Sequence, residues 1–391
     1  MSSRNAWLDQ AKGFACLLIV CHHLAFYGPM SDMVKPVATG LMDWLFEYAR
    51  MAVQVFLVLG GYLAAAGLAP QGLTRHAQVL PLLGKRFVRL VLPFAAALAV
   101  TILITELVRN MGFEHDSMSA APTWAQLLAH LFLLHGVGGW ESLSAGVWYV
   151  AIDFQLYAAA ALWIWACHRV ARSPLAAKPA KGTSQDAAPA QPASRWPWTL
   201  AQAGIVVLVA ASLWDWNLDS DLDNWAIYFF GAYGLGMMAW WAAHSQRPMG
   251  RWVWAAVMLV LGAVALWIEW RTRIALALTV ALVLALAGAV PWSDRVAYFR
   301  WAPLQQLGQM SYSVFLIHFS ICLLVNAVWH MLWPEGAFIN SIGLVLAVGL
   351  SVAAGHLLYR YVESQSASWM ELLRWQAGTM GVGAAVALNL I

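Results

Sequence analysis

Ten apolar stretches, each close to the length of a membrane-spanning helix, constrain this chain more than any other feature of its sequence. A helix needs about 20 predominantly apolar residues to cross a hydrocarbon layer of roughly 30 Å. Because 62% of the residues are hydrophobic and only 10% are charged, such stretches fill most of the chain. The sequence therefore predicts an all-α, polytopic membrane protein. The ten predicted spans cover residues 9–27, 50–68, 89–108, 146–167, 198–214, 224–243, 252–269, 273–290, 304–332 and 339–359.

Basic residues are divided unevenly between the two sides that ten spans create. Cytoplasmic loops of membrane proteins carry an excess of Lys and Arg. With the N-terminus inside, all but five of the 22 basic residues lie on the inner side, and counting the short apolar segment 124–134 as another span destroys this bias. We therefore predict ten spans with both termini cytoplasmic, and a re-entrant or interfacial helix near 124–134. The five outer basic residues are Lys35, Arg50, Arg109, Arg271 and Arg273.

A stretch rich in Pro, Ala, Ser and Lys interrupts the apolar pattern at residues 173–197. It lacks hydrophobic periodicity and is predicted to be a disordered cytoplasmic linker. This linker separates four helices in residues 1–172, which carry the candidate donor-binding and catalytic motifs, from six in residues 198–363. The apolar tail 364–391 is predicted to be cytoplasmic or membrane-associated, and it either lies against the membrane or packs on the bundle.

Net charge and cysteine usage exclude several classes of protein. A net charge of +3 without a dense Lys/Arg run gives no support for nucleic-acid binding. The four cysteines form no C-x-x-C pair, so we expect reduced thiols and no metal site. Asp9 and Lys12 interrupt the early part of the first apolar stretch, so no cleavable signal peptide is predicted.

The first predicted helix carries an acid, a base and an imidazole on one stripe. At 1.5 Å and 100° per residue, Asp9, Lys12, Cys16 and His23 fall within about 60° of one another, whereas His22 points away. His23 would lie about two-thirds of the way across the membrane. Ionisable groups at this depth face protein or water and are candidates for function.

Three further sites combine charge or imidazole with depth. One site is the pair Arg86 and Arg89, at positions i and i+3 near the inner end of the third predicted span. The two guanidinium groups either bind phosphate or act only as anchors at the membrane surface. Asp153 is a candidate catalytic acid or one half of a structural salt bridge. His318 is a candidate site residue or a packed histidine bonded to a carbonyl group.

Six short patterns, in the same order along the chain, resemble those of the acyltransferase 3 family of membrane-bound bacterial O-acyltransferases. The opening pattern has an acid, a basic residue, a glycine and a histidine, with Lys where Arg is usual. Gln54 and Gly60 stand where the family has an acid and a serine, and Asp153 stands where it has Glu. The patterns lie at Asp9–His23, Ala52–Tyr62, Arg86–Pro93, Trp148–Tyr157, Ser311–His318 and Tyr359–Glu363.

The resemblance implies an acyltransferase of the bacterial inner membrane. It implies transfer of an acyl group, acetyl by default, from cytosolic acyl-CoA to a hydroxyl of a cell-surface or secreted glycan or a lipid-linked saccharide. It also implies that His23 is the catalytic histidine and that Arg86 and Arg89, together with Lys12, bind the donor. His23 then acts as a general base or as a transient acyl carrier. We expect a tunnel through the bilayer to connect the nucleotide with His23.

Several residues are predicted to support this centre. Asp153 or Asp9 would orient the ring of His23, and the estimated depth favours Asp153. The remaining candidates for substrate contact or support are Trp148, Tyr149, Ser311, Tyr312 and His318. Homo-oligomerisation and a partner acyltransferase both stay open. The alternative function is a transporter or flippase of a polar or lipid-linked substrate, although no paired Gly- or Pro-broken helices point to one.

Overall fold

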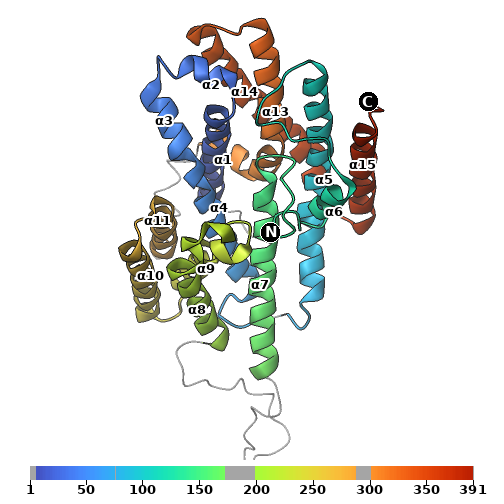
Figure 1. Ribbon diagram of the computed structural model, residues 1–391. Helices are drawn as coiled ribbons and strands as arrows, with labels where there is room; N and C mark the ends of the chain where they lie inside the picture. The colour runs from blue at the N-terminus through green and yellow to red at the C-terminus, as the bar shows by residue number, and fades with distance from the viewer. Residues whose placement is uncertain (1–5, 75, 172–198, 288–300, 391) are drawn as a thin grey trace, which may run out of the picture. The chain divides into compact units, whose positions relative to one another are not determined.

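The computed structural model describes residues 6–74, 76–171, 199–287 and 301–390, and every regular element in these ranges is a helix (Figure 1). The predicted linker 173–197 lies outside the described residues. The α-helices are α1 (Ala6–Phe26), α2 (Pro29–Val34), α3 (Thr39–Glu47), α4 (Val53–Leu68), α5 (Leu80–Asn110), α6 (Trp124–Leu131), α7 (Val147–Ala171), α8 (Leu200–Trp214), α9 (Ala226–Ala243), α10 (Pro248–Ile268), α11 (Thr272–Ala287), α12 (Ala302–Gln309), α13 (Ser311–Leu332), α14 (Ala337–Leu358) and α15 (Trp369–Ala387). Short 3-10 segments at Ala49–Ala52, Trp216–Leu218 and Ser220–Leu222 and a π-helix at Tyr359–Glu363 complete the set.

Helices occur at each of the ten predicted spans, which confirms the polytopic all-α class. The predicted span 304–332 is two helices, because the chain turns at Met310 between α12 and α13. Seven described segments are long and apolar enough to cross a membrane, so the number of ten crossings stays a prediction. These segments are Thr39–Leu68, Leu80–Asn110, Val147–Val170, Leu200–Leu218, Met249–Ile268, Ser311–Leu332 and Ala337–Glu363.

The chain divides into two compact units, and the predicted division at the linker stays a prediction. Unit 1 comprises Met1–Phe56, Gly84–Phe154 and Trp292–Ile391, and unit 2 comprises Leu57–Leu83 and Gln155–Pro291. Helices α4, α5 and α7 each contribute to both units. All the residues predicted from sequence to form a site belong to unit 1.

In unit 1, two glycines allow α1 and α12 to cross closely. A Cβ atom at Gly308 would overlap the carbonyl oxygen of Asp9, and one at Gly13 would overlap that of Leu304. Small residues let helix backbones approach in this way, as membrane helices commonly do. This contact fixes the N-terminal part of α1, including Asp9 and Lys12, against the segment that leads into α13.

In unit 2, glycines allow a similarly close crossing between the second half of α4 and α9. A Cβ atom at Gly61 would overlap the carbonyl oxygen of Tyr233, and one at Gly236 would overlap that of Val58. Helices α8 to α11 form one group with this pair (Figure 1).

The predicted short helix near 124–134 corresponds to α6, which begins with a capping box made by Thr123 and Gln126. The apolar tail forms α15, which lies beside α5 and α6 (Figure 1). The hydroxyl of Thr379 donates to the carbonyl oxygen of Ala95 over 2.8 Å, and the Gln376 amide donates to that of Leu131 over 3.2 Å. The tail thus packs on the helices of unit 1.

Candidate active site

Two histidines from α1 and α13 meet in unit 1. The Nδ1 atom of His23 lies 2.6 Å from the Nε2 atom of His318, and the two nearly parallel rings have centroids 4.9 Å apart. His318 is completely buried, whereas His23 is partly exposed. Two imidazoles that are 295 residues apart in the chain therefore share one site.

Hydrogen bonds around His318 fix the tautomers of both rings. The Nδ1 atom of His318 lies 2.8 Å from the carbonyl oxygen of Phe315 and 3.2 Å from that of Val314. A carbonyl oxygen only accepts, so the neutral His318 ring carries its hydrogen on Nδ1 and accepts at Nε2. His23 then donates from Nδ1, which leaves its lone pair on Nε2. The partly exposed ring of this pair is thus the one set to take up a proton.

Gly146, which directly precedes α7, places the start of that helix beside the histidine pair. A Cβ atom at Gly146 would lie 3.1 Å from the carbonyl oxygen of Phe315 and 3.5 Å from Cε1 of His318. The next residues of α7 include Trp148 and Tyr149, whose rings are 6.2 Å apart. The Tyr149 ring packs 5.4 Å from that of Phe315. Gly146 was not predicted, and a glycine immediately before a long apolar helix was the only signal for it.

A partly buried ion pair links α5 to α7. The Nη2 atom of Arg86 lies 2.5 Å from Oδ2 of Asp153, whose residue is only 6% exposed. Among the described residues no contact joins Asp153 to His23, and His318 occupies the Nδ1 position that an orienting carboxylate would need. The structure therefore brings together a predicted donor-binding residue and a predicted catalytic acid, and leaves both apart from the histidines.

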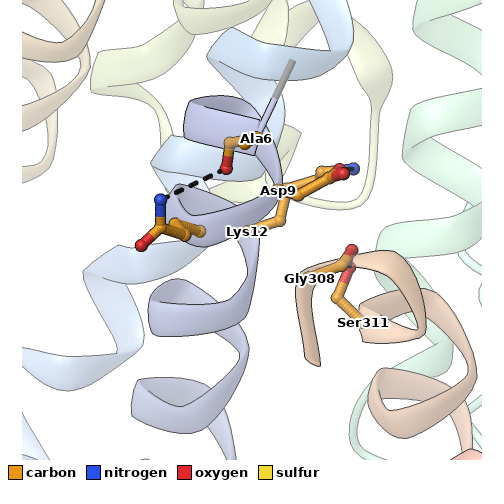
Figure 2. A network of polar contacts seen from close by, with 6 residues as sticks. Ala6, Asp9, Lys12, Gly308 and Ser311 are labelled. Atoms are coloured by element: carbon orange, nitrogen blue, oxygen red, sulfur yellow. Dashed lines mark hydrogen bonds and ion pairs between the residues drawn. The ribbon is translucent and has the colours of Figure 1, made fainter. Parts of the chain in front are cut away.

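A second ion pair lies within α1. The Nζ atom of Lys12 is 2.6 Å from Oδ1 of Asp9, and the other oxygen, Oδ2, is buried without a hydrogen-bond partner. Figure 2 shows that both side chains leave α1 on the side of Gly308 and Ser311. The Ser311 hydroxyl donates to the carbonyl oxygen of Gly308 over 2.9 Å. Lys12 thus keeps one carboxylate neighbour while a quarter of its side chain stays exposed.

The two predicted phosphate-binding arginines have different surroundings. Arg86 is bonded to Asp153, whereas Arg89 is exposed and lines a cavity together with Glu363. Glu363 is held from the other side, because the Ser313 hydroxyl donates to its Oε2 atom over 2.6 Å. Glu363 and Ser313 both lie within the sequence patterns described above, but neither was predicted as a site residue.

Tyr312 ties the start of α13 to α5. Its hydroxyl donates to the carbonyl oxygen of Leu90 over 2.8 Å. Thr101 and Ser320 connect the same two helices further along, with hydroxyl oxygens 2.6 Å apart. These contacts hold α13, and with it His318, in register with α5.

This arrangement offers a neutral imidazole base, a partly buried ion pair and a cation-lined cavity in one unit. Among the described residues no three side chains of His, Cys, Asp or Glu come close enough to hold a metal ion. A partly exposed imidazole with an ordered partner on one nitrogen is an arrangement suited to general-base or nucleophilic catalysis.

Comparison with protein families identifies the class of chemistry. Residues 5–178 match a family model described as an acyltransferase domain. No curated protein and no solved structure shows a significant match to the chain. The matched segment contains His23, Arg86, Arg89 and Asp153, and the apolar helices make the protein a membrane acyltransferase. The match over residues 5–178 supports the acyltransferase 3 family, which the six sequence patterns resemble.

Proposed function

We propose that this protein transfers a short acyl group, acetyl by default, from cytosolic acyl-CoA to a hydroxyl of a glycan or lipid-linked saccharide across the bacterial inner membrane. The observation that carries the proposal is the His23–His318 pair, because it orients one imidazole and leaves its Nε2 lone pair available within an acyltransferase domain.

The proposed step starts with the acceptor hydroxyl beside His23. Its oxygen attacks the thioester carbonyl carbon while Nε2 of His23 takes the hydroxyl proton. The carbon–sulfur bond then breaks, and the departing thiolate receives that proton, which gives an ester and free CoA. General-base help of this kind contributes about 10²–10⁴-fold to the rate. Alternatively, Nε2 attacks the thioester carbonyl carbon and CoA leaves as the thiolate. The acceptor hydroxyl then takes the acyl group from Nε2, and its proton goes to the thiolate, which gives the same ester and free CoA.

His318 supports the base in this proposal. When His23 becomes an imidazolium, its Nδ1–H still donates to His318, and the neutral acceptor ring stabilises the positive charge over 2.6 Å. The carbonyl groups of Phe315 and Val314 keep His318 in the accepting tautomer. His318 is therefore a positioning residue for His23, the role that sequence analysis gave to Asp153.

The test is acyl transfer by the purified full-length protein in nanodiscs, measured with labelled acetyl-CoA. Slow thioester hydrolysis serves as an acceptor-independent signal. We expect His23→Ala to lower turnover at least 100-fold. His22→Gln is the matched control, because the neighbouring His22 ring bonds to the carbonyl oxygen of Leu45 and not to His318. Full turnover in His23→Ala removes this residue from the mechanism, and uptake without bond cleavage would support a transporter.

A further inference from the structure

A cavity of about 730 Å³ lies in unit 1, where the first turns of α5 meet the start of α15. Its polar lining includes two cations, one carboxylate, two serine hydroxyls, a tyrosine hydroxyl and a glutamine amide, and Trp369 adds an indole. The lining residues include Lys85, Arg89, Glu363, Ser364, Ser368 and Trp369. The cavity thus combines positive charge with an aromatic surface, and this volume is in the range of sites that bind nucleotide-sized ligands.

The cations that line the cavity have exposed side chains. Lys85 and Arg89 are separated by one helical turn on α5 and are both exposed, whereas Arg86 between them is bonded to Asp153. Residues at i and i+4 lie on the same helix face, so Lys85 and Arg89 present their charges together. The acid of the cavity, Glu363, is held by the hydroxyl of Ser313. Two cations against one fixed carboxylate favour an anionic ligand.

The Trp369 side chain, which forms one wall of the cavity, packs against residues of α5. The Trp369 ring stacks on that of Phe87, with centroids 6.3 Å apart, and a Cβ atom at Gly84 would lie 3.3 Å from Trp369 Cζ2. Trp369 is nevertheless 57% exposed. Thr379 and Gln376 anchor the rest of α15 to α5 and α6. Trp369 therefore offers an open aromatic face on a rigid support.

The π-helix shapes the opposite wall. It continues α14 over Tyr359–Glu363 and is followed by the turn that leads to α15. π-helical turns are rare and frequently occur at functional sites. Ser368 caps α15 by accepting a hydrogen bond from the backbone N–H of Glu371, and the start of a helix favours negative charge.

We propose that this cavity binds the adenine nucleotide end of the acyl donor, with the phosphates at Lys85 and Arg89 and the adenine ring against Trp369. The inference rests on the proposed function in taking a CoA thioester as the donor. It assigns the tail helix α15 to donor binding, and it gives Arg86 a structural pairing with Asp153 instead of a direct phosphate contact. A phospholipid headgroup shares the phosphate but lacks the aromatic base.

Direct binding tests the proposal without any need for turnover. The full-length protein in zwitterionic nanodiscs would be titrated with CoA and with ADP by calorimetry. Lys85→Ala, Arg89→Ala and Trp369→Ala should each weaken binding by about tenfold, since stacking of a base on an aromatic ring and a charged phosphate contact are each of this size. Trp375→Ala and Arg374→Ala are matched controls on the same helix, outside the cavity, and should bind normally.

Further measurements distinguish a nucleotide from other ligands that contain phosphate. They also distinguish failure of this proposal from failure of the proposed function. Inorganic phosphate should bind far more weakly than ADP, and anionic lipid in the nanodisc should leave ADP binding unchanged. Trp369→Phe, which keeps an aromatic face, should retain most of the affinity. If CoA binds equally well to Lys85→Ala and Trp369→Ala, or if anionic lipid displaces ADP, the nucleotide assignment is wrong. Normal nucleotide binding in a protein whose turnover does not need His23 would instead overturn the proposed function alone.

Discussion

The two units use different contacts to hold their helices together. In unit 1, side chains with charge or an imidazole connect the helices, as in Arg86–Asp153 and His23–His318. In unit 2, glycines and indole N–H groups face backbone carbonyls, as in Trp241, which donates to Ala69 over 2.8 Å. Polar pairs between helices are costly in a membrane and are retained mainly where they serve function. The contrast indicates that the chemistry is concentrated in unit 1.

The sharpest contrast is between two arginines. Arg86 of unit 1 pairs with a carboxylate, whereas Arg271 of unit 2, only 7% exposed, is surrounded by neutral oxygens. Its guanidinium donates to Asn217 Oδ1 and to the carbonyl oxygen of Leu213, each over 2.8 Å. Unit 2 thus satisfies a buried cation without a counter-charge.

The largest expected effect comes from removing one partner of each arginine. Asp153→Ala should lower the free energy of unfolding by about 3 kcal/mol, the low end of the range for buried pairs, because it leaves a guanidinium side chain that is 32% exposed without its carboxylate. Asn217→Ala should cost about 1–3 kcal/mol. Denaturant unfolding in detergent measures both. The double variant Arg86→Met/Asp153→Leu should recover much of the loss, and equal costs for the two single variants would remove the contrast.

The second prediction uses the glycine crossings that the two units share. Gly308→Ala and Gly61→Ala should each destabilise by about 1–3 kcal/mol, because each new methyl group meets a backbone carbonyl. Only Gly308→Ala should also reduce acetyl-CoA turnover, since it displaces α1, which carries His23. Gly378→Ala on α15, where nothing lies within 4 Å, is the control and should leave stability unchanged. Equal loss of turnover in both units would show that the chemistry is not confined to unit 1.

Sequence patterns located the helices but not their partners. Apolar runs identify spans because the membrane requires them, and the histidine and arginine candidates followed from charge within those runs. The pairing of Arg86 with Asp153 joins residues 67 positions apart, and periodicity along one helix carries no information about such contacts. The estimated depth suggested Asp153 as the partner of His23, whereas Asp153 pairs with Arg86. Gly146, before the start of α7, lies beside His318. Lys85 and Trp369 carry no signal in the sequence, because they come together only where the tail helix α15 packs on α5.

The third prediction tests the coupling inside the histidine pair. His318→Ala should lower turnover about tenfold, because His23 loses the acceptor that fixes its tautomer. In a His23→Ala background the same change should have no further effect, since the two rings act as a unit. Steady-state thioester hydrolysis is measured for the unchanged protein, the two single variants and the double variant. Their rates give the coupling free energy between His23 and His318. Additive losses would mean that His318 contributes through packing alone.

The smallest effect concerns a second histidine pair of unit 1, outside the membrane-spanning segments. His130 and His135 are completely buried, and their nearly parallel rings lie 4.1 Å apart. Burial lowers the pKa of His130 to about 4 and that of His135 to about 3. Both rings therefore stay neutral in the folded protein near neutral pH, whereas an unfolded chain binds protons with a pKa of about 6.5.

Because the unfolded state takes up protons first, stability is fully present above the unfolded pKa and falls as the pH drops below it. Between pH 7 and pH 6 each ring should cost about 0.7 kcal/mol, so the thermal midpoint should fall by a few degrees at most. His135→Phe should remove about half of the pH dependence that this pair contributes. Since this pair makes no contact with His23 among the described residues, acetyl-CoA turnover in His135→Phe at pH 7 should equal that of the unchanged protein. A turnover defect at pH 7 without a loss of stability would extend the chemistry of unit 1 to this second pair.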